Sequence, residues 1–283
     1  MRVAVAVLTL AVAACSSTNA RSAPTRASTA VPSSTTAITT TPTAVVPAPS
    51  PGPAPTGVGL PPVIEHGARD QARVAITFDS NLTDAMLRKL DDGKVASYAN
   101  TAVIDELDRL DVPATFFLAG KWMERYPDLT KRLVADPRFE LGSHSYEHRA
   151  FRMPCYGLGA LPPDQFASDV ERSFTVLRRF TAQPTSYFRF PGGCLDDAAL
   201  RGVAPTGVTV VQYDVASGDA FGTSVKAIVS DTLRQTKNGS VIVMHVTGGD
   251  TAPLTAQALP AIVEGLRSRG FQLVKLSDLM RGS

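Results

Sequence analysis

The chain has little of what marks disulfide-rich scaffolds or nucleic-acid-binding domains. It contains only three cysteines in 283 residues, too few for the dense disulfide framework of small secreted proteins. It also lacks a surplus of positive charge in its main part, because residues 59–283 carry 25 basic and 26 acidic side chains. A domain that binds nucleic acid is expected to show a basic stripe. We therefore expect no nucleic-acid partner.

The start of the chain lacks an apolar run long enough to span a bilayer. It reads MRVAVAVLTLAVAAC, with one cation before about a dozen apolar residues, which is typical of a secretory signal peptide. Its ending, Val12-Ala13-Ala14-Cys15, resembles a bacterial lipobox. We interpret residues 1–14 as a lipoprotein-type signal peptide and Cys15 as the lipidated residue. The alternative is an ordinary secretory signal in which this cysteine is incidental.

A lipid at Cys15 predicts a protein held on the outer face of the bacterial cell membrane, facing the cell wall. Residues 15–58 contain no Asp or Glu and are rich in Ser, Thr, Ala and Pro, with eight prolines between Ser16 and Gly57. Such a segment cannot bury enough apolar surface to offset its conformational entropy. We interpret it as a disordered tether, followed by an entry segment at 59–71.

From residue 72 to the end at 283, strand-like and helix-like patterns alternate. The expected strands are 73–78, 114–119, 138–143, 186–190, 207–213, 241–245 and 271–275, and the expected helices are 101–110, 121–135, 164–181, 225–237 and 254–269. Aromatic and aliphatic residues recur at helical spacing in 164–181, which we interpret as core packing. This alternation predicts a single α/β domain with a mostly parallel sheet, open or closed into a barrel.

Reactive side chains follow several of the expected strands. Five of them are Asp79, His144, His148, Arg189 and His245. Parallel sheets and α/β barrels collect catalytic groups at the carboxyl ends of their strands. Two imidazoles four residues apart, His144 and His148, can converge on one metal ion. The alternative for this pair is a surface loop or a buried, hydrogen-bonded pair.

Asp79 and His245 admit two interpretations each. Asp79 can bind a metal or act as a general base toward a water, or it can cap the next turn. His245 can donate a proton to a leaving group, or it can be a hydrogen-bonded core histidine. Arg189 and Asp219 would hold the base and tune its pKa.

The two remaining cysteines, Cys155 and Cys194, also leave two possibilities. In an exported domain such a pair most often forms a disulfide. The alternative is a structural zinc site made by both cysteines with His144 and His148. The close cysteine spacing typical of structural zinc is absent from the sequence, so we favour the disulfide.

Taken in order, the segments ITFDSN, HSYEH, RFPGG, YDVASGD and IVMH form one pattern. This pattern resembles the polysaccharide deacetylase family, also called the NodB-homology domain or carbohydrate esterase family 4. The resemblance covers about residues 72–280 and all of the family's motif positions. It implies an α/β fold of the NodB type, a distorted (β/α) barrel, forming a single catalytic domain.

The resemblance also implies roles for the metal-binding and basic residues. Asp79 matches the family's catalytic base. His144 and His148 match two histidine ligands of a divalent metal, usually Zn²⁺, with Co²⁺ or another divalent ion as the alternative. Arg189 matches the arginine that positions the base.

Three further residues take roles from the same resemblance. His245 matches the histidine that protonates the departing amine. Asp219 matches an aspartate that orients either the arginine or this histidine. The backbone N–H near Gly192 corresponds to a donor that stabilises the oxyanion.

The sequence departs from the family pattern in two places. The second aspartate that usually follows the base is replaced by Ser80, and in a variant spacing the ligand position falls on Asn81. An amide oxygen can coordinate a metal but brings no charge, so metal affinity should fall. Asp84, acting through a water, is a weaker substitute. The usual tryptophan of the fourth motif is replaced by Ala220 and Phe221, which should change the wall of the substrate groove.

The implied function is metal-dependent removal of N-acetyl groups from amino sugars of a cell-envelope glycan such as peptidoglycan. The expected partners are therefore an acetylated glycan and, through Cys15, the membrane, and we expect a monomer. Two alternatives remain. One is a surface glycan-binding lipoprotein with weak or no catalysis, and the other is an O-acetyl esterase acting on a polysaccharide.

Overall fold

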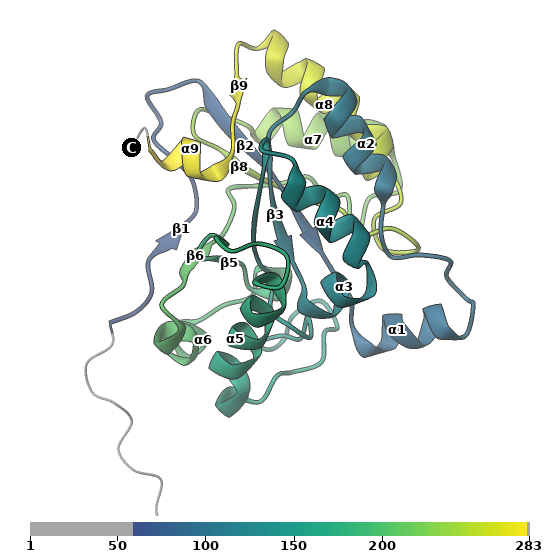
Figure 1. Ribbon diagram of the computed structural model, residues 1–283. Helices are drawn as coiled ribbons and strands as arrows, with labels where there is room; N and C mark the ends of the chain where they lie inside the picture. The colour runs from purple at the N-terminus through teal and green to yellow at the C-terminus, as the bar shows by residue number, and fades with distance from the viewer. Residues whose placement is uncertain (1–58, 282–283) are drawn as a thin grey trace, which may run out of the picture. The chain divides into compact units, whose positions relative to one another are not determined.

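A computed structural model of the protein describes residues 59–281, which belong to one compact unit. Figure 1 shows how their helices and strands are arranged. The signal peptide, the lipidated Cys15 and the tether all fall at residues 1–58, outside the described residues. Within the described part of the chain, no helix has the length and apolar character needed to cross a membrane.

A single sheet of parallel strands organises the domain. Its strands are β1 (Val63–Ile64), β2 (Arg73–Ser80), β3 (Ala114–Leu118), β4 (Phe139–Ser143), β5 (Tyr187–Phe188), β6 (Thr209–Val211), β7 (Val215–Ala216), β8 (Val241–His245) and β9 (Gln272–Leu273). They are paired in the order β1-β6-β5-β4-β3-β2-β8-β7, with β9 added beside β2. The predicted α/β fold, a curled and incompletely closed barrel of parallel strands, is confirmed.

The register of the sheet brings the predicted reactive residues to one edge. Asp79 on β2 pairs directly with His245 on β8. On the other side of β2, the ends of β3 and β4 are level, and Ser143 of β4 pairs with Phe188 of β5. His144 immediately follows β4, and Arg189 immediately follows β5. Four reactive side chains therefore start from the same carboxyl edge, as the sequence predicts.

Helices cover the sheet from outside. They are α1 (Asp84–Asp91), α2 (Thr101–Leu110), α3 (Gly120–Arg125), α4 (Pro127–Ala135), α5 (Phe166–Leu177), α6 (Asp197–Val203), α7 (Val225–Gln235), α8 (Thr255–Ser268) and α9 (Leu276–Met280). In Figure 1, α2, α7 and α8 group on one side of the sheet, while α5 and α6 lie together at another. The apolar residues of α5 are buried or partly buried in the core, as their spacing predicts.

Several predicted elements differ from those observed. The prediction of one helix over 121–135 is wrong, because Pro127 has no N–H to continue the ladder and separates α3 from α4. The strands expected at 186–190, 207–213 and 271–275 are shorter than predicted. The sequence reading missed α1 and α6, although Thr83 and Asp196 cap their first turns. The entry segment also contributes β1, which pairs with β6.

Candidate active site

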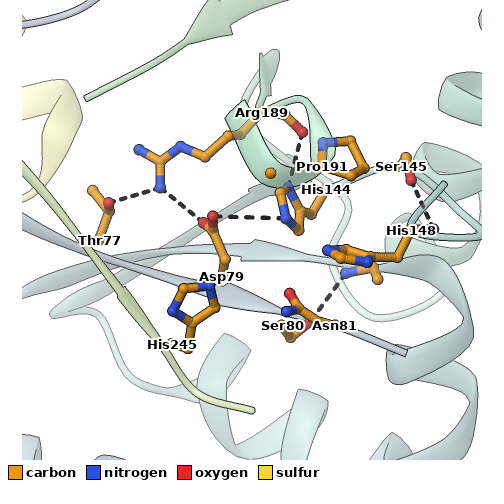
Figure 2. Close-up of polar contacts among 12 residues, drawn as sticks. Thr77, Asp79, Ser80, Asn81, His144, Ser145, His148, Arg189, Pro191 and His245 are labelled. Carbon is orange, nitrogen blue, oxygen red and sulfur yellow. Dashed lines mark hydrogen bonds and ion pairs between the residues drawn. The ribbon is translucent and has the colours of Figure 1, made fainter. Parts of the chain in front are cut away.

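Asp79 lies at the centre of the residues gathered at the carboxyl edge. It is buried at the end of β2, a strand that is buried along almost its whole length. Its Oδ1 lies 2.8 Å from Arg189 Nη1, and its Oδ2 lies 3.6 Å from His144 Nε2. Figure 2 shows the carboxylate between these two groups. The Asp79 carboxylate is therefore held on one side by the guanidinium of Arg189 and faces the imidazole of His144 on the other.

Arg189 is fully buried, and protein groups satisfy its guanidinium. Nη1 donates to both Asp79 and the hydroxyl of Thr77, each at 2.8 Å. Nε and Nη2 donate to the carbonyls of Val211 and Gln212, each at 3.2 Å. Its guanidinium carbon also lies 4.0 Å from the ring centroid of Phe117. A buried arginine with this many partners is rigid, so it fixes the position of the Asp79 carboxylate.

His144 follows β4 and is oriented by the backbone beside Arg189. Its Nδ1–H donates to the Arg189 carbonyl at 2.9 Å, which leaves Nε2 with a lone pair on the side of Asp79. Burial lowers the pKa of His144, although the charge of Asp79 partly opposes that effect. A neutral imidazole with a defined tautomer is the form that binds a metal ion.

His148 stands beside His144, with 5.0 Å between the two ring centroids. Burial, together with the neighbouring His144 and His245, holds its pKa well below the usual value. Its backbone has a φ of 53°, a left-handed conformation that turns the chain sharply. The backbone N–H of His148 donates to Ser145 Oγ at 3.0 Å, which closes this turn.

A buried carboxylate from another helix supports the turn that carries both histidines. Asp169 on α5 accepts the backbone N–H of Tyr146 at 2.8 Å and that of Glu147 at 3.2 Å. Burial raises the pKa of Asp169 despite these hydrogen bonds. The sequence reading missed this residue, because nothing in the helical pattern of α5 distinguishes it from a surface aspartate.

Three residues that follow Asp79 differ in whether their side chains are free to complete a metal site. Ser80 is fully buried, and its Oγ accepts the N–H of Ala119 at 3.0 Å, so its hydroxyl serves a structural contact. The backbone N–H of Asn81 donates to Thr247 Oγ1 at 2.8 Å, which fixes the start of the following turn. Asp84 is exposed and ion-paired with Lys121 at 2.5 Å. The suggestion that Asp84 substitutes as a ligand is therefore not supported by its position.

Two buried polar atoms at this site are left without partners. Within residues 59–281, Asn81 Oδ1 and His148 Nδ1 are both inaccessible to solvent and accept no hydrogen bond. Buried polar atoms are nearly always satisfied, so these two unpaired atoms are available to bind a ligand. The described residues contain no cluster of three or more His, Cys, Asp and Glu arranged for a metal. The candidate set is instead two neutral imidazoles and one amide oxygen, donors that suit a divalent ion.

His245 forms the other side of the site with Asp219 as its partner. Its Nδ1–H donates to Asp219 Oδ1 at 2.8 Å, and its backbone N–H donates to Oδ2 at 2.7 Å. Ser217 and Thr255 donate their hydroxyls to the same carboxylate. Burial lowers the pKa of His245, but the charge and hydrogen bond of Asp219 outweigh it and raise the pKa above its usual value.

These contacts decide between the two roles predicted for Asp219. The carboxylate orients the histidine and makes no contact with Arg189 among the hydrogen bonds of the described residues. The interpretation that Asp219 orients the arginine is therefore wrong. With its Nδ1 occupied by Asp219, His245 has Nε2 as the nitrogen able to serve a substrate.

Cys155 and Cys194 form a disulfide, so the alternative zinc site built from both thiolates is excluded. The disulfide packs on Gly192, where an added Cβ would come 2.6 Å from Cys155 Sγ. Gly192 also has a φ of 66°, so both its space and its backbone require glycine. The role of its N–H at an oxyanion stays a prediction.

A cavity of about 550 Å³ opens over these groups. The predicted residues on its wall are Asp79, Asn81, His144, His148, Gly192, Phe221 and His245. Figure 2 shows the labelled side chains of this set around Asp79. The arrangement places a candidate carboxylate base, a candidate metal set and a protonatable histidine around one space that a small ligand can enter.

The polysaccharide deacetylase family model matches residues 66–211, more than half of the chain. A peptidoglycan-N-acetylglucosamine deacetylase of Bacillus cereus is 27% identical over 217 residues, covering 77% of this chain and 71% of that protein. A crystal structure of a peptidoglycan N-acetylglucosamine deacetylase with a bound N-oxidanyl-benzamide compound superposes with a TM-score of 0.65. That match has 25% identity and covers 78% of this chain and 94% of the other.

A CE4 family pseudoenzyme from Bacillus anthracis shares the fold, with a TM-score of 0.62 and 21% identity over 77% of this chain and 69% of its own. The chain belongs to the polysaccharide deacetylase family. The predicted family and the predicted enzyme class, a polysaccharide deacetylase acting on an amide bond, are confirmed at this level.

Proposed function

We propose that the protein removes N-acetyl groups from amino sugars of a cell-envelope glycan such as peptidoglycan. The observation that carries this proposal is the grouping of Asp79, His144, His148 and His245 around one cavity, with Asn81 Oδ1 left unpaired beside them. The relatives named as peptidoglycan N-acetylglucosamine deacetylases support the choice of substrate. The products would be acetate and a free amine on the sugar.

His144, His148 and Asn81 would hold a divalent metal, with Zn²⁺ as the first candidate. Their chemistry fits, because burial keeps both imidazoles neutral and the amide oxygen has no other partner. When bound, such an ion would supply polarisation of the acetyl carbonyl and activation of a water. The rest of the chemistry belongs to the side chains of this chain.

Asp79 would act as the general base. Arg189 binds Oδ1 and fixes the carboxylate, and the second oxygen, Oδ2, faces the imidazole of His144. A water whose proton passes to Asp79 adds its oxygen to the acetyl carbon. The backbone N–H near Gly192 would donate to the oxyanion that forms there.

His245 would act as the general acid. The carbon–nitrogen bond breaks as the amine nitrogen takes a proton from His245, and acetate is released. The raised pKa caused by Asp219 favours the protonated form that this step needs. After one turnover Asp79 carries a proton and His245 has lost one. The site is ready for the next cycle once a proton has left Asp79 and His245 has regained one.

The test is acetate release from a panel of N- and O-acetylated glycans, with and without a chelator. We expect release from N-acetylated oligosaccharides, loss with chelator and recovery on addition of Zn²⁺ or Co²⁺. No release from any glycan under any metal would contradict the proposal. Comparison of the N- and O-acetylated substrates also tests the esterase alternative.

A second candidate is a glycan-binding protein without catalysis. The neutral Asn81 at a position that usually carries charge favours it, because a weaker site binds less metal. Measurement of one equivalent of metal together with acetate release would exclude this candidate.

The location and assembly of the protein are part of the same proposal. A lipoprotein signal ending at Cys15 would hold the enzyme on the outer face of the cell membrane, within reach of the cell wall, and we propose that it acts as a monomer. Mass spectrometry of the membrane-extracted protein tests the lipid at Cys15, and light scattering tests the monomer.

A further inference from the structure

Two aromatic side chains on the rim of the active-site cavity are exposed. Tyr156 is 69% exposed and Phe221 is 73% exposed, the highest values among the large apolar side chains of the described residues. Both line the cavity that holds the candidate catalytic groups. Exposing two large rings to water is unfavourable, so such a patch usually marks a binding surface.

The two rings form a pair although they come from distant parts of the chain. Their centroids are 5.4 Å apart and their planes are inclined by 35°, so the rings present adjoining faces. Aromatic residues at binding surfaces supply a large rigid contact area at a low cost in conformational entropy. We call Tyr156 and Phe221 the aromatic pair.

Rigid anchors hold the first ring of the pair. Tyr156 follows Cys155, whose disulfide to Cys194 ties this loop to the segment after Arg189. Its ring also packs over Gly192, where an added Cβ would lie 3.1 Å from Tyr156 Cδ2. The ring is therefore fixed next to the peptide predicted to stabilise the oxyanion.

The second ring comes from a different loop, the turn at residues 218–221. Phe221 closes a turn in which its N–H donates to the Gly218 carbonyl at 3.1 Å. The same turn carries Asp219, which the hydrogen bonds to His245 and Thr255 hold in place. The aromatic pair therefore bridges the loops that carry the two halves of the site.

We propose that the aromatic pair binds a further sugar ring of the glycan, next to the sugar that loses its acetyl group. A pyranose presents apolar C–H groups on its faces, and these pack against aromatic faces. The occupant is a neutral sugar of an extended chain, because the pair is continuous with the cavity that takes the reacting sugar. This inference rests on the proposed function for the identity of the glycan, and it makes the enzyme selective for chains over single sugars.

Binding measurements test this without depending on turnover. Isothermal titration calorimetry compares a β-1,4-linked tetrasaccharide of N-acetylglucosamine with the monosaccharide, using full-length protein that carries Asp79→Asn. We expect Tyr156→Ala and Phe221→Ala each to weaken tetrasaccharide binding about 3- to 10-fold and to leave monosaccharide binding unchanged. Tyr156→Phe should keep the tetrasaccharide affinity, because the ring is retained.

Met153→Ala is the matched control, since Met153 is exposed on the same loop as Tyr156 but does not line the cavity. It should leave both affinities unchanged. The unfolding midpoint of each variant shows that the fold is intact. Unchanged tetrasaccharide affinity in both alanine variants, or no measurable tetrasaccharide binding by the parent, overturns the inference. Weakened tetrasaccharide binding in the alanine variants, together with no acetate release by the protein that retains Asp79 under any metal, would support the aromatic pair and contradict the proposed catalysis.

Discussion

Replacing Asp219 by asparagine tests how the site keeps its acid protonated. The carboxylate accepts four hydrogen bonds, two of them from the ring and the backbone of His245. These two N–H groups face different oxygens, Oδ2 and Oδ1. Whichever way an asparagine amide is turned, its NH₂ group faces one of these two N–H groups of His245. That buried donor then loses its acceptor.

The stability cost of Asp219→Asn follows from that count. A buried donor left unsatisfied costs about 1–3 kcal/mol, with a further loss because the hydrogen bonds to the carboxylate are charge-assisted. Because the pKa of His245 is raised and that of Asp219 is lowered in the folded state, the pair stabilises the protein fully at pH between the unfolded-state pKa of the aspartate and that of the histidine. This contribution disappears as pH rises through the pKa of His245 in the folded protein. Urea unfolding at acidic and alkaline pH measures the difference, which should be larger at acidic pH.

The catalytic effect of the same substitution has a defined sign. Without the Asp219 charge, the pKa of His245 falls, so the alkaline limb of the pH–rate profile moves to lower pH. The profile of kcat/KM for acetate release records this limb. Asp214→Asn is the matched control, because Asp214 also accepts from a strand N–H, a hydroxyl and an arginine but lies outside the site. An unmoved alkaline limb in Asp219→Asn, beside an equal loss of stability in both variants, would refute the reasoning.

Three further predictions follow from other contacts of the site. Arg189→Met leaves the buried Asp79 carboxylate without its cation and should lower the free energy of unfolding by about 3–5 kcal/mol, measured by urea denaturation. Asn81→Asp should tighten zinc binding about tenfold or more in a chelator competition, yet lower the unfolding midpoint without metal, since the new charge then has no partner. Removing the disulfide with Cys155→Ser and Cys194→Ser, which frees a loop of 39 residues, should cost about 4 kcal/mol of stability, and an unchanged midpoint on calorimetry would contradict this.

The sequence allowed the central residues to be predicted because each follows an apolar strand. Asp79 and His245 end β2 and β8, and their pairing in register follows from parallel strands that are both buried. The histidines after β4 and the arginine after β5 meet them at the same edge. Strand burial and chain direction therefore carry most of the information about the site.

Contacts between elements that are distant in sequence could not be predicted in the same way. Asp169 supports the histidine turn from α5, and its partner peptides are fixed only once that helix packs beside the turn. The choice of His245 as the partner of Asp219 likewise depends on how a loop after β7 folds back on β8. Exposure of Tyr156 and Phe221 is also a property of the folded surface, because aromatic residues are commonly buried.

The measurement that tests the account most directly is acetate release by Asp79→Asn protein with its metal content measured in parallel. We predict that the variant folds, keeps the parent's equivalents of metal and loses at least about 10²-fold in kcat, because the metal set does not include Asp79 while the proton transfer does. Acetate release at the parent's rate by a metal-loaded Asp79→Asn protein would contradict the assignment of this carboxylate as the base.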